Sequence, residues 1–190
     1  MIKVYDFDKT LTYKDTTMMF LFYCCNNFKK SYVKKLWIVI YAVLHKLRVL
    51  DNNLFKSLSY GVVFKEKKKK EIVNISKAFV ADNSHIFNTL GRQVMVNKED
   101  QGYIVTASPE LYVKIYFSHM IVVGTTFSFD RDETFNGLKM NCYGKNKVIA
   151  LNKIGVSKVD EFFTDSFSDM PVMNISKSVF LVKGDVIKRL

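Results

Sequence analysis

Two aspartates near the start of the chain, Asp6 and Asp8, lie where an apolar segment ends. They follow residues 2–5, a short β-branched and aromatic run that is typical of a buried strand. Alternate residues of a strand point the same way, so both carboxylates face one site. With the hydroxyl of Thr10 nearby, the pair indicates a nucleophile, a neighbouring acid or base, and a seat for a metal ion. The alternative is a solvated loop in which Thr10 or Thr12 caps a helix.

Further polar side chains follow the other segments that are expected to form strands. They are Thr106, Ala107, Ser108, Asp165 and Asp169, and the start of a helix expected over residues 144–155 adds Lys145 and Lys147. In an open parallel sheet the carboxyl ends of the strands meet at one edge, where ligands bind. Several acids, a hydroxyl and a lysine at one edge are the groups that metal-assisted phosphoryl transfer needs.

The elements that must position these groups change in character along the chain. Residues 13–100 contain no proline, and their apolar runs are separated by Asn, Lys and Asp-Asn clusters, which predicts four or five helices. From Gly102 onward we expect strands at residues 103–106, 121–124, 159–163 and, last, 179–182, alternating with helices. Residues 125–140 fit small hairpins around residues 130–132 and 136–137.

This alternation predicts an α/β fold with a Rossmann-like parallel sheet. The core would comprise residues 1–12 and 101–190, and residues 13–100 would form an all-helical cap inserted after the first strand. Clusters that begin at Asp15, Asp51 and Asp82 predict the starts of helices within that insert.

Composition limits the class of protein. With 190 residues and 48% hydrophobic residues, the chain is large enough for one good core or a core with an inserted lobe. The three cysteines suit neither a disulfide framework nor a CxxC metal site, no signal peptide is apparent, and the longest apolar run, residues 36–44, is shorter than the roughly 20 residues that span a bilayer. We therefore expect a cytoplasmic protein. If it contacts lipid, we expect peripheral attachment to the inner face of the membrane.

The net charge of +11 is concentrated in one part of the chain. Residues 28–70 contain twelve Lys and Arg against two acids. A localised basic segment favours an anionic partner, such as a phosphorylated substrate, an acidic lipid surface or nucleic acid. For the lysines of residues 65–70, the alternative is a solvated face that aids solubility.

Taken in order, these residues resemble the four motifs of the haloacid dehalogenase superfamily. The matching positions are residues 6–12, Thr106, Lys147 and residues 164–169. The helical insert is similar to the cap of the branch that includes phosphoserine phosphatase. Within that branch, the chain most resembles the bacterial phosphatidylglycerophosphatase C family, through Asp15, the basic and apolar cap, and residues 106–110.

The resemblance implies a phosphatase mechanism centred on Asp6. This residue would attack phosphorus and form an aspartyl-phosphate, while Asp8 would act as general acid and then general base, with a pKa raised relative to that of Asp6. Mg²⁺ would be held by Asp6, Asp165 and the backbone carbonyl of Asp8. Asp169 would orient the catalytic lysine or a water on the metal.

The remaining motif positions would bind the phosphate. Thr106 would hold a phosphoryl oxygen, and Lys147 would offset negative charge, its place in the motif favouring it over Lys145. Lys9 stands where much of the superfamily has glycine, although lysine is familiar in this branch. Because Asp8 is present, hydrolysis or phosphotransfer fits the sequence better than dehalogenation.

The cap would select the organic part of the substrate. Asp15 occupies the position that reads the amino group in the phosphoserine enzymes, and Ala107 and Ser108 would complete the substrate site. Those enzymes also need a cap arginine for the substrate's carboxylate. Arg48 and Arg92 are the only cap arginines, and neither lies in a recognisable motif, which argues against phosphoserine.

Two apolar runs of the cap, residues 18–25 and 36–44, are separated by Lys29, Lys30, Lys34 and Lys35. This pattern predicts an interfacial helical hairpin on an anionic membrane and favours a lipid phosphate such as phosphatidylglycerophosphate as substrate. Three alternatives remain: the runs are the cap's own core, the substrate is a soluble metabolite such as phosphoserine or a sugar phosphate, or the chain is a basic membrane-binding module without activity. No nucleic-acid-binding motif is visible, so no nucleic acid is expected.

Overall fold

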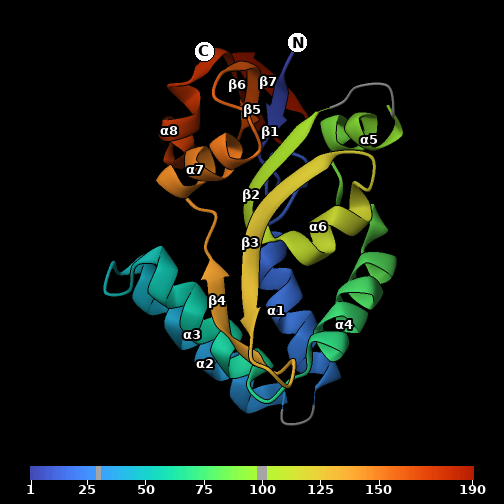
Figure 1. The fold of residues 1–190 in the computed structure, drawn as a ribbon, viewed down its shortest axis with the longest axis vertical. Helices are drawn as coiled ribbons and strands as arrows, with labels where there is room; N and C mark the ends of the chain where they lie inside the picture. Colours follow the sequence, from blue (N-terminus) through green and yellow to red (C-terminus); the bar gives the residue numbers. More distant parts are fainter. Residues whose placement is uncertain (29–30, 98–101) are drawn as a thin grey trace.

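The structure is a computed structural model that describes residues 1–28, 31–97 and 102–190 (Figure 1). Its strands are β1 (Lys3–Tyr5), β2 (Tyr103–Pro109), β3 (Ile121–Phe129), β4 (Phe135–Met140), β5 (Val159–Thr164), β6 (Ser176–Lys183) and β7 (Val186–Arg189). Its α-helices are α1 (Thr16–Asn27), α2 (Ser31–Lys46), α3 (Asn52–Phe64), α4 (Lys69–Asp82), α5 (Thr89–Val96), α6 (Glu110–Tyr116), α7 (Lys145–Lys153) and α8 (Met170–Met173).

The strands form one sheet in the order β4-β3-β2-β1-β5-β6-β7. The five central strands pair in parallel, and an antiparallel strand closes each edge. Successive side chains of β1 point to opposite faces of the sheet. Val4 belongs to the hydrophobic cluster that contains Leu151 of α7 and Val172 of α8. Tyr5 belongs to the cluster that contains Val113 of α6. The predicted α/β fold with a mostly parallel sheet is confirmed.

Five α-helices lie between β1 and β2, as the proline-free insert predicts. The side chains of Asp15 and Asp51 accept hydrogen bonds from the amides of α1 and α3 and so cap these helices, as expected. α4 ends at Asp82, and the cluster that begins there starts only a 3-10 turn, Ser84–Ile86, with Asn83 at its N-cap position; the next α-helix, α5, is capped by Asn88. The predicted boundary between cap and core, at residues 100 and 101, lies outside the described residues.

A long hairpin formed by β3 and β4 extends from the sheet toward the inserted helices (Figure 1). Phe127 of β3 makes edge contacts with Phe64 of α3, with ring centroids 5.5 Å apart, and with Tyr60 at 5.0 Å. The turn expected near residues 130–132 is present, but residues 136–137 lie inside β4, so there is one hairpin. Because its tip packs against the helices, β3 is longer than its apolar run of four residues suggests.

The other end of the sheet also differs from expectation. The last strand is β7, which pairs antiparallel with β6, and not residues 179–182. β7 has no buried residue and lies at the edge of the sheet, so its sequence lacks the apolar run that marks an inner strand.

The two apolar runs predicted to form an interfacial hairpin have opposite environments. In α1, Phe20, Leu21 and Cys24 are fully buried, so this helix belongs to the core and the prediction is wrong for it. In α2 only Ile38 is fully buried, and most of its apolar side chains are at least partly exposed. Lys29 and Lys30, expected between these helices, lie outside the described residues.

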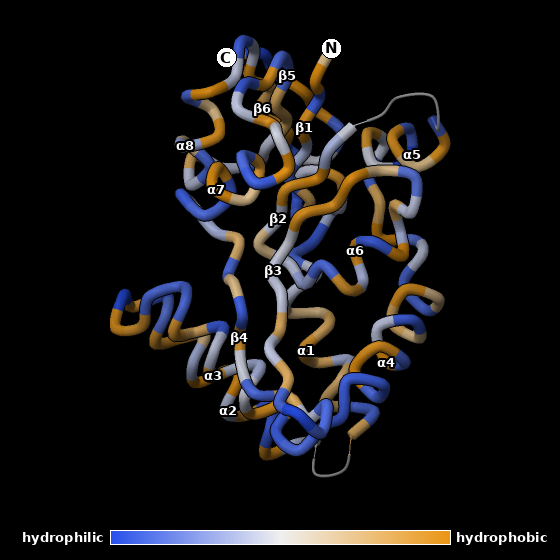
Figure 2. The backbone as a smooth tube through the Cα atoms, in the orientation of Figure 1, coloured by the Kyte–Doolittle hydropathy of each residue, from blue (hydrophilic) through white to orange (hydrophobic). Residues whose placement is uncertain are grey.

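The lysine-rich stretch at residues 65–70 packs against the hairpin tip at the end of the molecule opposite the chain termini, where Figure 2 shows a hydrophilic region. Lys68 donates hydrogen bonds to the Asp132 carbonyl and the Thr134 hydroxyl, and Lys67 pairs with Glu71 at 2.8 Å. Several of these lysines therefore hold the hairpin against α4, a role that the sequence did not indicate.

Candidate active site

A pocket of about 300 Å³ opens where β1, β2 and β5 end, at the edge of the sheet that the sequence predicts. Among the described residues that line it are the sequence-predicted Asp6, Asp8, Asp15, Ala107, Lys147, Asp165 and Asp169. Thr106 and Ser108 are fully buried next to it and are not part of its lining. The structure thus gathers residues that are separated by more than a hundred positions in the sequence.

Phe7 explains why the two neighbouring acids face this pocket. Its ring is fully buried and lies within 6.3 Å of the rings of Phe87, Tyr112 and Phe117. Anchoring Phe7 in the core turns the residues on both sides of it toward the pocket.

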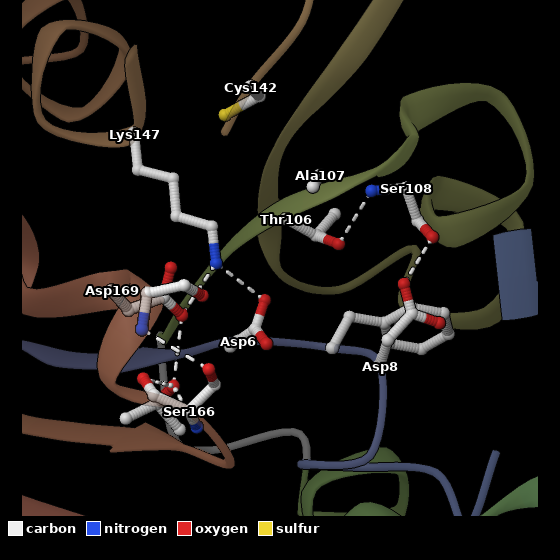
Figure 3. A network of polar contacts seen from close by, with 12 residues as sticks. Asp6, Asp8, Thr106, Ala107, Ser108, Cys142, Lys147, Ser166 and Asp169 are labelled. Carbon is white, nitrogen blue, oxygen red and sulfur yellow. Dashed lines mark hydrogen bonds and ion pairs between the residues drawn. The ribbon is translucent and has the colours of Figure 1, made fainter. Parts of the chain in front are cut away.

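Asp6 is joined to Asp169 through the ammonium group of Lys147 (Figure 3). The Lys147 Nζ lies 2.7 Å from Asp6 Oδ1 and 2.7 Å from Asp169 Oδ2, and the latter also accepts a hydrogen bond from Thr164 at 2.9 Å. Lys147 lies in the first turn of α7 and is 2% exposed, whereas Lys145 is exposed on the same helix. The predicted preference for Lys147 therefore agrees with the geometry.

Asp8 has a separate set of partners. Its Oδ1 accepts hydrogen bonds from the amide, at 2.6 Å, and the hydroxyl of Thr16, and its Oδ2 accepts one from the Ser108 hydroxyl. Tyr112 and Thr17 extend this network by hydrogen bonds to Ser108, each 2.8 Å long. The sequence does not indicate Thr16, Thr17 or Tyr112 as site residues, because buried hydroxyl residues in helices carry no motif.

Burial raises the pKa of both acids. Burial raises the pKa of Asp6 to about 7, with a further increase from the nearby Asp169 charge and an opposing effect of Lys147. Burial and the Asp15 charge raise the pKa of Asp8 to about 6, and hydrogen bonds from Ser108 and Thr16 limit the rise. These donors stabilise the Asp8 carboxylate and so limit the rise of its pKa.

The end of β2 has two distinct surfaces. Ser108 donates its amide to the Thr106 hydroxyl oxygen at 2.9 Å, which leaves the hydroxyl proton of Thr106 available to another acceptor. The Ser108 side chain faces Asp8 and not the pocket, so this geometry favours a supporting role over the predicted substrate contact. Asp15 lines the pocket and at the same time caps α1 through the Met18 amide at 3.1 Å.

The donor set fits the expected magnesium ion. Among the described residues, no three His, Cys, Asp or Glu side chains are grouped closely enough to hold a metal ion by themselves. The predicted site, however, needs only the carboxylates of Asp6 and Asp165 with the Asp8 carbonyl, and Mg²⁺ commonly keeps several waters. Asp6 Oδ2 accepts no hydrogen bond from the described residues, so this oxygen is free to bind a cation. Burial raises the pKa of Asp165, because the buried carboxylate has lost water around its charge, and a bound cation would stabilise that charge.

Several residues of the inserted helices also line this pocket, among them Lys56 and His45. Lys56 of α3 is 4% exposed and donates a hydrogen bond from its Nζ to the Ala107 carbonyl. His45 of α2 stacks on Phe55 with ring centroids 5.0 Å apart. In the sequence, Lys56 is recognisable only as part of the basic segment, because an isolated lysine in a helix gives no sign that it is buried.

Comparison with known families places this geometry in context. The family model described as haloacid dehalogenase-like hydrolase matches residues 4–174. The chain belongs to this family. None of the curated proteins compared with this hydrolase matches it.

Several solved structures share the fold of the hydrolase at low sequence identity. A protein of unknown function from Bordetella pertussis Tohama I has a TM-score of 0.74 and 13% identity, over 91% of this chain and 85% of that one. A phosphoserine phosphohydrolase-like protein from Francisella tularensis subsp. tularensis SCHU S4 has a TM-score of 0.65 and 15% identity, with coverages of 93% and 84%. A phospho-aspartyl intermediate analogue of phosphoserine phosphatase has a TM-score of 0.60 and 9% identity, with coverages of 94% and 84%.

The structure of the hydrolase also explains its departure at Lys9. The backbone of this residue has φ = 57°, in the left-handed region that glycine adopts most easily. A lysine there carries a conformational cost of roughly 1 kcal/mol, and the Lys9 amide donates a hydrogen bond to the Thr12 hydroxyl at 3.1 Å. The turn that separates Asp8 from α1 is therefore kept without glycine.

Proposed function

We propose that this hydrolase is a Mg²⁺-dependent phosphatase that cleaves phosphomonoesters through an aspartyl-phosphate on Asp6. The observation that carries the proposal is the buried chain from Asp6 through Lys147 to Asp169, which leaves Asp6 Oδ2 open to the pocket. A buried carboxylate held against an ammonium group is a positioned nucleophile. Mg²⁺, bound by Asp6, Asp165 and the Asp8 carbonyl, would supply positive charge to the phosphoryl oxygens.

In the proposed reaction, each of the two steps is assigned to residues in or beside the pocket. Asp6 Oδ2 attacks phosphorus and the P–O bond to the alcohol breaks, while Asp8 gives its proton to the leaving oxygen. In the second step Asp8 takes a proton from water, whose oxygen attacks phosphorus and releases inorganic phosphate from Asp6. Lys147 offsets charge on Asp6 and the phosphoryl group, and the Thr106 hydroxyl donates to a phosphoryl oxygen. The Thr16 and Ser108 donors hold Asp8 in position for both proton transfers.

The decisive experiment is hydrolysis of para-nitrophenyl phosphate with Mg²⁺. We expect turnover by the wild-type protein, loss of at least about a thousandfold in Asp6→Asn, and loss of activity when Mg²⁺ is chelated. Asp132→Asn makes the same chemical change in an exposed turn and should retain activity. An inactive wild type with Mg²⁺, or an active Asp6→Asn, would reject the catalytic proposal in favour of a binding module without activity.

We propose further that the substrate is a lipid-linked or membrane-proximal phosphate. Exposed large apolar side chains gather along α2 and the segment that follows it: Tyr32, Val33, Leu36, Trp37, Val39, Val43, Leu47, Val49 and Leu54. We call this set the α2 surface. An apolar surface of this extent supports an interaction site.

An anionic lipid bilayer is the partner that this surface fits best. α2 has no acidic residue, and Lys46 and Arg48 are exposed at its end, next to the apolar side chains. Apolar side chains rimmed by cations insert between lipid tails while the cations meet the head groups. His45 lines the catalytic pocket from the same helix, so docking α2 on a bilayer brings the pocket close to the head groups.

A substrate panel tests this part. Phosphatidylglycerophosphate in mixed vesicles should have a higher kcat/KM than phosphoserine or sugar phosphates, because the lipid surface concentrates enzyme and substrate together. In the opposite case, with a soluble phosphate preferred by about tenfold or more, the substrate would be a soluble metabolite and the α2 surface would have another partner.

A further inference from the structure

Lys56 is a buried cation, and no acidic side chain of the described residues lies at ion-pair distance from it. Its ammonium group has three protons to donate and one partner among the described residues, the Ala107 carbonyl. Lys147, in the same pocket, lies 2.7 Å from two carboxylates. No ion pair of the described residues includes Lys56.

Such a charge is costly when nothing anionic is close. Burying an ammonium group costs several kcal/mol unless hydrogen bonds and an opposite charge compensate for the lost water. In agreement, burial lowers the pKa of Lys56 to about 8, despite the attraction of Asp8 and Asp15 at longer range. A folded protein keeps a charge in this situation most easily where a bound anion compensates for it.

Lys56 is not needed to satisfy the carbonyl that it contacts. The Ala107 carbonyl also accepts a hydrogen bond from the Thr125 hydroxyl at 2.7 Å, so it would keep a partner without the lysine. The ammonium group therefore contributes little to folding that Thr125 does not already supply.

The position of Lys56 indicates which part of a substrate it meets. Asp8 and Asp15 are the carboxylates that most affect its pKa, whereas Asp6 and Asp169 hold Lys147. Asp8 is the proposed donor of a proton to the leaving oxygen, so a cation on its side of the pocket lies near the leaving alcohol. Phe55 and His45, from the same wall, line the pocket beside it.

We propose that Lys56 binds a second anionic group, carried by the alcohol part of the substrate. The preferred substrates are then phosphomonoesters whose alcohol bears a carboxylate or a phosphodiester close to the ester. This inference rests on the proposed phosphatase function and narrows its substrate class. Lys56 acts as a specificity-determining residue, whereas Lys147 and Thr106 bind the transferred phosphoryl group.

Two esters that differ only in an anionic group test the proposal: phenyl phosphate and 4-carboxyphenyl phosphate, compared in wild type and Lys56→Met. Wild type should prefer the carboxylate ester, and Lys56→Met should reduce the ratio of the two kcat/KM values about tenfold, mainly through KM. Lys56→Arg should restore most of the ratio. Lys77→Met, which removes an exposed lysine of α4, controls for net charge and should leave the ratio unchanged.

A binding measurement separates this inference from the proposed function. Calorimetric titration with phenylphosphonate and 4-carboxyphenylphosphonate, which are not hydrolysed, should show the same preference in wild type and its loss in Lys56→Met. A proportional loss for both ligands, or an unchanged ratio in Lys56→Met, would overturn the role of Lys56. If neither ester is turned over but the phosphonates still discriminate, the phosphatase function fails and the anion site stands.

A stability measurement detects a purely structural lysine. Because Thr125 still satisfies the Ala107 carbonyl, the melting temperature of Lys56→Met should equal or exceed that of wild type. A clear fall in melting temperature together with equal losses for both esters would show that Lys56 supports the fold and not the substrate.

Discussion

At the residue scale, the site depends on one buried cation placed between two buried carboxylates. Lys147, Asp6 and Asp169 are all nearly inaccessible to water, so their mutual attraction replaces the solvation that each has lost. Removing one partner leaves the others uncompensated. The proposed catalytic arrangement is therefore also a part of the folded structure that tolerates little change.

Replacing Lys147 by Met should cost both activity and stability. The two carboxylates would lose their shared cation, and we expect unfolding free energy to fall by about 3 kcal/mol, as measured by urea denaturation. Lys145→Met, which removes an exposed lysine two residues away, should stay within about 0.5 kcal/mol of wild type. Similar stabilities for the two variants would show that the buried ion pairs contribute nothing net.

At the element scale, α5 holds the loop that follows Asp6 and Asp8. Asn88 caps α5 through the Gly91 amide and donates from its side chain to the Thr10 carbonyl at 2.8 Å. Gly91 then packs so closely that an added Cβ would lie 2.0 Å from the Leu11 carbonyl oxygen. A helix far along the chain thus sets the position of the loop that begins at Asp6.

Two glycine-to-alanine substitutions test this contact. Gly91→Ala should lower unfolding free energy by about 2 kcal/mol or more, because the loop must move away from the new methyl group. Gly61→Ala lies in α3, where an added Cβ meets no atom within 4 Å, and should raise stability by roughly 0.5 to 1 kcal/mol through better helix propensity. Equal responses in thermal unfolding would mean that the close approach at Gly91 has no consequence.

At the scale of the whole molecule, the catalytic pocket and the α2 surface lie at neighbouring positions. The inserted helices, the β3–β4 hairpin and the sheet share one hydrophobic cluster. It includes Tyr5 of β1, Phe64 of α3 and Phe127 of β3. This shared core fixes α2 relative to the pocket. No helix among the described residues is long and apolar enough to cross a membrane.

Sedimentation with vesicles tests whether the α2 surface contacts lipid. The protein should bind vesicles that contain anionic lipid, bind neutral vesicles more weakly, and be released by salt, since each lysine near the surface contributes roughly 1 kcal/mol. Leu36→Glu should weaken binding while para-nitrophenyl phosphate hydrolysis persists. Ile154→Glu makes the same type of change at the exposed end of α7 and serves as the control. Dimers that dissociate in Leu36→Glu, without any vesicle binding, would instead identify a second copy of the chain as the partner.

The sequence by itself determined the α/β class, and it singled out residues at the strand exits, and Lys147 at the start of a helix, that the structure places in or beside one pocket. These features follow from local periodicity and from side-chain chemistry at short spacing, which the chain displays directly. The roles of Asp6, Asp8, Thr106, Asp165 and Asp169 stay predictions.

Only the tertiary structure decided which equally apolar or equally basic segments are buried. α1 and α2 both read as apolar runs, yet α1 is enclosed and α2 is exposed, because burial depends on what packs against a helix and not on its composition. In the sequence, Lys56 is one of twelve basic residues in the segment 28–70, and the structure sets it apart because α3 places it beside the Ala107 carbonyl. The same reason applies to the buried hydroxyls around Asp8, which come together only when α1, β2 and α6 fold against one another.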